Sequence, residues 1–180
     1  LSGNTYTYTA GTYTAGAGAL KLTGSGPMVN AAAAPTFVNL TLNATGPTTF
    51  VNTTAAATPL TFIVSGIFNQ TAGDVALGIH TLQIAGSFTR TAGAWTMSSG
   101  YLEFNTGTAF AQGSGFAVNN LMVDVSISGT VGTAFTVNKN LVLKAGAVLT
   151  MTTLKLTLGD GCVVERRSDG AALSSVPTFA

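Results

Sequence analysis

The run F-N-Q-T-A-G at Phe68–Gly73 returns twenty residues later as F-T-R-T-A-G at Phe88–Gly93. The residues before it repeat with the same spacing, since F-I-V-S-G at Phe62–Gly66 is followed by L-Q-I-A-G at Leu82–Gly86. A further copy, L-V-L-K-A-G, begins at Leu141. A fixed period of about twenty residues is typical of a chain that stacks one supersecondary unit on the next. The repeat therefore predicts an elongated architecture.

The composition predicts that these units are built from β-strands. The chain has 30 threonines and 22 glycines among 180 residues, and only 7% of its residues are charged. Threonine is β-branched and favours pleated surfaces, whereas the strong helix formers Glu, Lys and Arg are scarce. The net charge of +1 gives no support to binding of nucleic acid or of an anionic membrane. Apolar runs are broken within a few residues, far short of the ~18–20 that a membrane-spanning helix needs, so no such span is expected.

Short alternating segments mark the expected strands, and A-G, S-G, T-G and D-G pairs mark the corners between them. Two all-β folds fit this pattern: a β-sandwich and a parallel β-solenoid with coils of about twenty residues. The solenoid is favoured, because each coil meets equivalent neighbours above and below, whereas successive strands of a Greek key do not. The expected strands are Thr5–Thr9, Leu20–Thr23, Thr36–Leu42, Thr61–Val64, Thr81–Ile84, Tyr101–Phe104, Asn120–Ile127, Phe135–Val137, Leu141–Leu143 and Leu154–Leu158.

Residues 1–180 are expected to form one solenoid segment of roughly eight coils, with an axial rise of about 4.8 Å per coil. L-K-L-T at Leu20–Thr23 resembles L-K-L-T at Leu154–Thr157, and P-T-F occurs at both Pro35 and Pro177. These matches predict that the two ends lie at the same point of a longer cycle, as in a tandem array. Leu1 is not a methionine and no signal peptide follows it, so a processed or excised part of a larger protein is expected. The charged segment 161–170 is expected to be a protruding loop.

The search for chemistry finds few candidates. Of the six carboxylates, Glu103 and Asp124 are 21 residues apart and are expected to lie close together on adjacent coils. His80, the single histidine, is expected at an exposed corner or on an outward strand position. The single cysteine, Cys162, cannot form an internal disulfide and is interpreted as a small buried residue. No catalytic, metal-binding or cofactor-binding residue is assigned, and no cofactor is expected.

The alternation T-Y-T-Y-T at Thr5–Thr9, with Tyr13 close behind, allows two interpretations. Tyr6, Tyr8 and Tyr13 could form a flat ligand-binding face for surface glycans. The simpler interpretation has the threonines facing solvent and the tyrosines packed on a neighbouring coil.

Six further aromatic side chains are expected to stack in the interior or at its edges. A column of like residues, coil upon coil, would hold the rod together, each buried aromatic contributing about 1.5–3 kcal/mol. The residues assigned to this stack are Phe62, Phe68, Phe88, Phe104, Phe110 and Trp95.

The cadence F-x-x-T-A-G-x-x-x-x-G-x-x-T-L-x-I-x-G-x-F resembles the repeat regions of large secreted proteins of Bacteroidetes-type bacteria, which are exported by the type IX secretion system. The matching segments are Phe68–Phe88, Phe88–Phe110 and Leu141–Gly159, and Ala172–Ala180 resembles the entry to another repeat. The resemblance implies an extracellular or cell-surface location and a structural or adhesive role, and it brings no catalytic residues with it.

The sequence thus favours a non-enzymatic, extracellular solenoid segment of a bacterial surface protein or filament, acting as a stiff stalk or spacer. Its expected partners are further copies or repeats of itself, joined head to tail, and surface glycans. Two alternatives stay open: a carbohydrate-active β-helix enzyme, either a lyase or a glycosidase, and a glycan-binding module.

Overall fold

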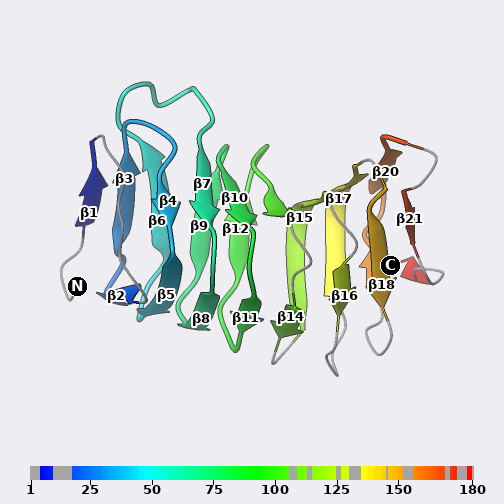
Figure 1. Ribbon diagram of the computed structural model, residues 1–180, viewed down its shortest axis with the longest axis horizontal. Coiled ribbons are helices and arrows are strands. Elements are labelled where there is room, and N and C mark those ends of the chain that lie inside the picture. The colour runs from blue at the N-terminus through cyan, green and yellow to red at the C-terminus, as the bar shows by residue number, and fades with distance from the viewer. Residues whose placement is uncertain are drawn as a thin grey trace.

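In a computed structural model the chain winds into a parallel β-solenoid of about seven turns, stacked along the long axis of the molecule (Figure 1). The structure describes residues 5–9, 18–105, 109–112, 115–124, 127–129, 135–144, 146–151, 156–168, 171–173 and 178–179. Within these ranges there is no helix, and every pair of bonded strands is parallel. This confirms the predicted solenoid over the sandwich, whose sheets are antiparallel.

The strands of successive turns form three sheets that run the length of the rod. The five-stranded sheet contains β1 (Thr5–Tyr8), β3 (Met28–Ala31), β6 (Thr48–Asn52), β9 (Val75–Gly78) and β12 (Trp95–Met97). The eight-stranded sheet contains β2 (Ala19–Gly24), β5 (Asn39–Ala44), β8 (Phe68–Ala72), β11 (Phe88–Arg90), β14 (Ala109–Gln112), β16 (Ile127–Gly129), β18 (Val148–Met151) and β21 (Ala172–Leu173). The nine-stranded sheet contains β4 (Thr36–Phe37), β7 (Thr61–Val64), β10 (Thr81–Ile84), β13 (Leu102–Phe104), β15 (Phe116–Val123), β17 (Phe135–Leu143), β19 (Leu156–Leu158), β20 (Val163–Arg166) and β22 (Thr178–Phe179).

Two of the three faces merge in the second half of the rod. The first part of β15, Phe116–Val118, pairs with the start of β17, and after a register shift Asn120–Val123 pairs with its end. The ring of Trp95 in β12 lies 5.5 Å from that of Phe116, so β15 begins where the five-stranded sheet stops. One bent strand therefore covers both faces from this turn onward.

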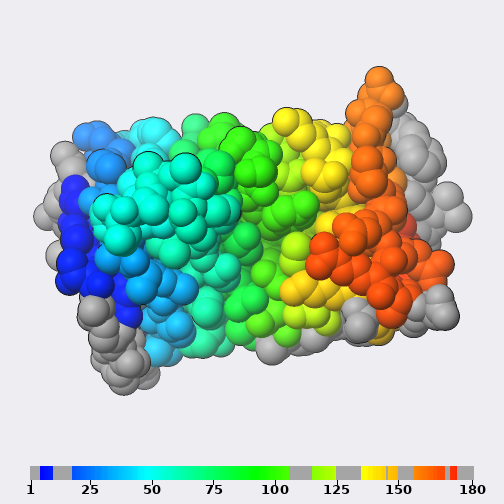
Figure 2. Space-filling model, turned by 90° about the horizontal axis from the view of Figure 1, so that it is seen from above, coloured from blue at the N-terminus to red at the C-terminus, as the bar shows by residue number. Residues whose placement is uncertain are grey.

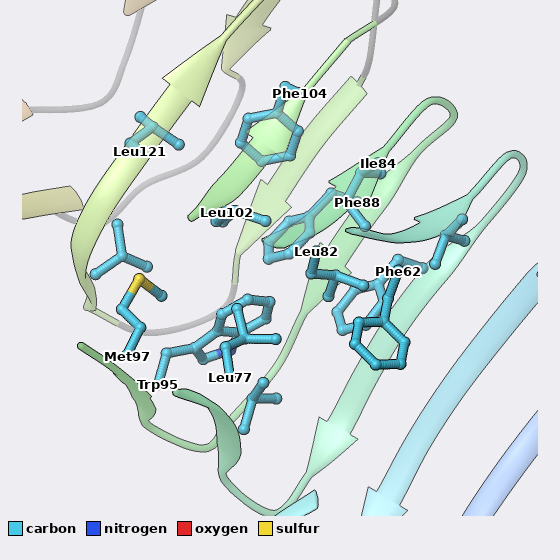
Figure 3. Packing of buried hydrophobic residues seen from close by; sticks show 14 of the residues in the cluster. Phe62, Leu77, Leu82, Ile84, Phe88, Trp95, Met97, Leu102, Phe104 and Leu121 are labelled. Atoms are coloured by element: carbon cyan, nitrogen blue, oxygen red, sulfur yellow. The ribbon is translucent and has the colours of Figure 1, made fainter. Parts of the chain in front are cut away.

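The twenty-residue repeat sets the register between turns. Phe88 pairs with Phe68, and Leu82 pairs with Phe62, as the sequence predicts. The rings of Phe68 and Phe88 are nearly parallel, with centroids 5.3 Å apart. Figure 3 shows side chains such as Phe62, Phe88 and Trp95 turned into the space between the sheets.

The predicted interior aromatic stack is confirmed for the residues whose side chains the structure describes. Phe62, Phe68, Phe88 and Phe104 are fully buried, and Trp95 is 6% exposed. The side chain of Phe110 lies outside the described set, although its backbone pairs with that of Phe88. The interior also includes aromatic residues that the prediction omitted: Phe37, Phe50, Phe116 and Phe135.

Two predicted strands are wrong because each contains a corner. The segment Thr36–Leu42 divides at Val38 into β4 and β5, which belong to different sheets. Likewise, Asn120–Ile127 spans the end of β15 and the start of β16. Neither corner contains a glycine, so the sequence gives no turn signal there.

The segment 161–170 is also not simply a loop. Val163–Arg166 forms β20, which pairs with β17 in parallel. All four side chains of β20 are exposed, and the orange part of the chain stands out from the C-terminal end of the rod (Figure 2). The charged residues correctly predicted that this segment is exposed, but they gave no indication that it contains a strand.

The two sequence matches behind the expected long cycle fall differently on the rod. The P-T-F match lies on the same sheet at both ends, in β4 (Thr36–Phe37) and in β22 (Thr178–Phe179). The L-K-L-T match does not. Leu20–Thr23 lies in β2 of the eight-stranded sheet, whereas Leu156–Thr157 lies in β19 of the nine-stranded sheet. Turn length varies, since Leu40 pairs with Phe68, 28 residues on, whereas Phe68 pairs with Phe88 after 20. The longer turn contains the residues 53–60, which form the loop above β6 and β7 in Figure 1. Because the turns differ in length, a similar segment elsewhere in the sequence does not always lie on the same face of the rod.

Candidate functional sites on the rod

The tyrosines of β1 do not form an outward face. The side chains of Thr5 and Thr7 are exposed, whereas Tyr6 and Tyr8 are half-buried and pack against the core. The Tyr6 ring meets Phe37 edge-on at 5.7 Å. This arrangement is the simpler of the two interpretations of the T-Y-T-Y-T segment. Tyr13 lies outside the described residues.

The structure brings Glu103 and Asp124 together through a third residue, Lys144. The Lys144 Nζ lies 2.6 Å from Glu103 Oε1 and 3.2 Å from Asp124 Oδ2. The three residues come from successive turns, because Asp124 N–H donates to Phe104 O and Lys144 N–H donates to Val123 O. Burial lowers the pKa of Lys144, but hydrogen bonds and charge from the two carboxylates outweigh this and raise it. Two carboxylates that share one ammonium ion tie three turns together.

Sequence reasoning found the two acids but missed the lysine. Glu103, Asp124 and Lys144 follow one another at intervals of 21 and 20 residues, which is the period of the solenoid. Tracing charges at that period, rather than searching for acids alone, would have found the cluster.

A buried asparagine closes the corner that follows β12. Asn120 is 1% exposed, and its Nδ2 donates to the carbonyl oxygens of Ser98, at 3.1 Å, and Gly100, at 2.8 Å. Its Oδ1 accepts from Asn140 Nδ2 on the next turn, at 2.7 Å. The side chains thus satisfy backbone carbonyls at a corner, where no strand can do so.

Side chains of the repeat also hydrogen-bond to backbone carbonyls at the two T-A-G corners, Thr71–Gly73 and Thr91–Gly93. Gln70 Nε2 donates to Gly73 O at 2.5 Å, and Arg90 donates to Gly93 O through both Nε, at 2.9 Å, and Nη2. Gln70 and Arg90 pair in register, so these bonds stack on adjacent turns. The buried guanidinium of Arg90 also lies over the Phe116 ring, 4.7 Å from its centroid.

His80 is buried, which corrects the expectation of an exposed position. It lies at the corner between β9 and β10 and is 5% exposed. Its Nδ1 accepts a hydrogen bond from Leu60 N–H at 3.1 Å, and its ring meets Phe62 edge-on at 5.6 Å. Burial lowers the pKa of His80. The corner is shielded from solvent because the chain contacts it as it returns from the 53–60 insertion. The residues around His80 in the sequence give no indication of this contact.

Cys162 is half-buried and packs against the core, and burial raises the pKa of its thiol. Within the described ranges, no group of three or more His, Cys, Asp or Glu residues is arranged to hold a metal ion. A search of the same residues finds no helix with the length and apolar character to cross a membrane. Neither a family model, nor a curated protein, nor a solved structure matches this chain.

Proposed function

We propose that this chain is a rigid structural segment of an extracellular bacterial surface protein or filament, and that it serves as a stalk or spacer. The supporting observation is the continuity of the stack. Parallel ladders join the described strands turn by turn on the faces of the rod, from β1 to β22. At about 4.8 Å per turn, seven turns give a rod of roughly 35 Å.

Stiffness follows from the direction of the bonds. The hydrogen bonds between strands of successive turns run along the rod axis, so an axial load is shared by several strand pairs at each step. The Lys144 cluster and the Asn120–Asn140 bond add side-chain ties in the same direction. The low charge of the chain would let neighbouring rods lie together without strong repulsion.

Single-molecule pulling between the two ends of the chain tests the stalk function. Cys162→Ala would be made first so that attachment cysteines at the ends are unique. A load-sharing stack should release length in steps of about 70 Å, the extended length of one twenty-residue turn. A chain that extends smoothly at low force, without steps, would not serve as a stiff spacer.

Axial contact with a further copy of the chain is part of the proposal. The side chains of Val163 and Val164 are 59% and 41% exposed on β20, whose described neighbour is β17 alone. Exposed apolar side chains on a strand with one described neighbour favour pairing with a further strand. Sedimentation at increasing concentration should show association that Val164→Lys abolishes. Thr89→Lys, on the side of the rod, should leave it intact, and a monomer at every concentration would refute the contact.

A further inference from the structure

A groove of about 480 Å³ lies beside the 53–60 insertion, on the outer surface of the five-stranded sheet. Three successive strands contribute to it through Thr49, Ala76 and Thr96, and Ala56 of the insertion forms part of its wall. Binding sites for small ligands are commonly about 300–1,000 Å³ in volume, so the groove is large enough for one.

The sequence explains why the surface is hollowed at this groove. Ala76 and Gly78 present little or no side chain, and the pairing of β9 with β12 shifts register between Thr96 and Met97. Gly78 has a φ of +57°, which favours glycine at this position. The insertion then adds a rim that the regular twenty-residue turns lack.

The chemistry of the lining favours a neutral, hydroxyl-rich ligand. Among the described residues that line the groove, none carries a charge at neutral pH, so a carboxylate or phosphate would find no counterion there. Thr49, Thr96 and Ser98 supply hydroxyl groups, while Ala56, Ala76 and Ile79 supply apolar surface. A sugar ring presents this same mixture of hydroxyl groups and apolar C–H faces.

His80 gives the groove a directional donor. Its Nδ1 accepts the Leu60 N–H, so the neutral ring carries its proton on Nε2. The hydrogen bond with Leu60 uses Nδ1, and Nε2 is not one of the buried polar atoms without a partner in the described part of the chain, so this nitrogen keeps access to the groove that His80 lines. A ligand oxygen in the groove would accept its hydrogen bond.

We propose that this groove binds one neutral pyranose ring, with His80 Nε2–H and the hydroxyls of Thr49, Thr96 and Ser98 as its polar contacts. The proposal is independent of the stalk function, because a rod needs no ligand. The site is small and open, so we expect a dissociation constant on the order of 1 mM for a monosaccharide.

Titration of the ¹⁵N-labelled chain with methyl glycosides of glucose, galactose and mannose, followed by NMR, tests the proposal. At least one glycoside should shift the backbone amide signals of Gly78 and Thr96 and the Nε2–H signal of His80. Glucuronate should produce much smaller shifts. If none of the three neutral sugars shifts these signals at tens of millimolar, or if glucuronate binds equally well, the proposal is wrong.

Matched variants separate binding from folding. Thr96→Phe should fill the groove and abolish the shifts, whereas Thr89→Phe, at an exposed position on the neighbouring face, should leave them unchanged. His80→Asn keeps an acceptor for Leu60 N–H but lacks the Nε2 donor, so affinity should fall about fivefold. Sugar binding that survives Thr96→Phe would place the ligand elsewhere and overturn the assignment.

Discussion

Phe88 shows how a single side chain joins several turns. It is fully buried, and its ring lies 5.3 Å from Phe68, 5.5 Å from Phe104 and 5.8 Å from Phe116. Each of these partners comes from a different strand, so a change at this position affects more than one turn. The repeat in the sequence identified this residue, because its equivalent stands twenty positions earlier.

Phe88→Asp should prevent stable folding. Truncating a buried phenylalanine to alanine costs about 3–5 kcal/mol, and an unpaired charge in the same apolar site adds further cost. Chemical denaturation followed by circular dichroism measures the effect. Thr89→Asp is the matched control, since Thr89 is exposed and should change the free energy of unfolding by about 0.5 kcal/mol or less. A Phe88→Asp variant as stable as the parent would contradict the assigned packing.

His80 makes the stability of the rod depend on pH. Burial lowers its pKa in the folded state, so the folded protein resists protonation whereas the unfolded chain takes up a proton near pH 6.5. The contribution is therefore fully present above about pH 6.5 and declines as the pH falls toward the lowered folded-state value. Melting temperature should drop over this interval.

The variant His80→Asn isolates this effect. Asparagine keeps an acceptor near the position of Nδ1 but does not titrate, so the decline in melting temperature below pH 6.5 should become shallower. An identical pH profile in the parent and the variant would show that other groups cause the decline.

At the scale of elements, corners rather than strands carry the specific polar contacts. Asn120, Gln70 and Arg90 lie in strands but donate hydrogen bonds to backbone carbonyl oxygens at corners. Asp124 and Lys144, which share an ion-pair cluster with Glu103, directly follow the strands β15 and β17. Strands satisfy their own backbone groups by pairing, whereas corners need side chains to do so. The sequence predicted most strands of the nine-stranded sheet, but it did not predict most strands of the other two sheets, such as β8 and β11.

Lys144→Met should destabilise the rod by about 1–3 kcal/mol. The side chain of Glu103 is 7% exposed, so removal of the lysine leaves a nearly buried carboxylate without its ion pair. Lys139→Met is the control, since Lys139 is exposed on β17, the strand that ends directly before Lys144. The double variant Lys144→Met, Glu103→Gln should recover part of the loss, because the buried charge is then absent. If Lys144→Met and Lys139→Met lower the free energy of unfolding equally in urea denaturation, the Lys144 cluster does not stabilise the rod.

At the scale of the whole molecule, each turn contacts mainly the turns directly before and after it. Such stacks behave as chains of nearest-neighbour interactions, so local damage should spread outward from its position. Gly86 tests this, since a Cβ there would collide with the carbonyl oxygen of Gly66 on the preceding turn. At Gly146, by contrast, a Cβ would meet nothing within 4 Å, and only its φ of +71° disfavours other residues.

Gly86→Ala should therefore abolish hydrogen-exchange protection in β7 and β10 first, while β17 and β19 stay protected. Gly146→Ala should cost about 1 kcal/mol and leave the pattern of protection largely unchanged. Mass spectrometry of exchanged peptides measures both. A uniform loss of protection along the chain after Gly86→Ala would show that the rod unfolds as one unit.

The sequence by itself determined the all-β class, the solenoid and the register of its central turns, because stacked turns repeat the same environment and so repeat the same residues. The sequence also predicted which aromatic residues form much of the core and that Glu103 lies near Asp124. Only the tertiary structure decided that the chain turns at Val38 and after Val123, that β20 is a strand, and that His80 is buried where the chain returns from the 53–60 insertion. These features depend on contacts between turns, and a local pattern of apolar and polar residues carries no record of what lies on the turn above or below.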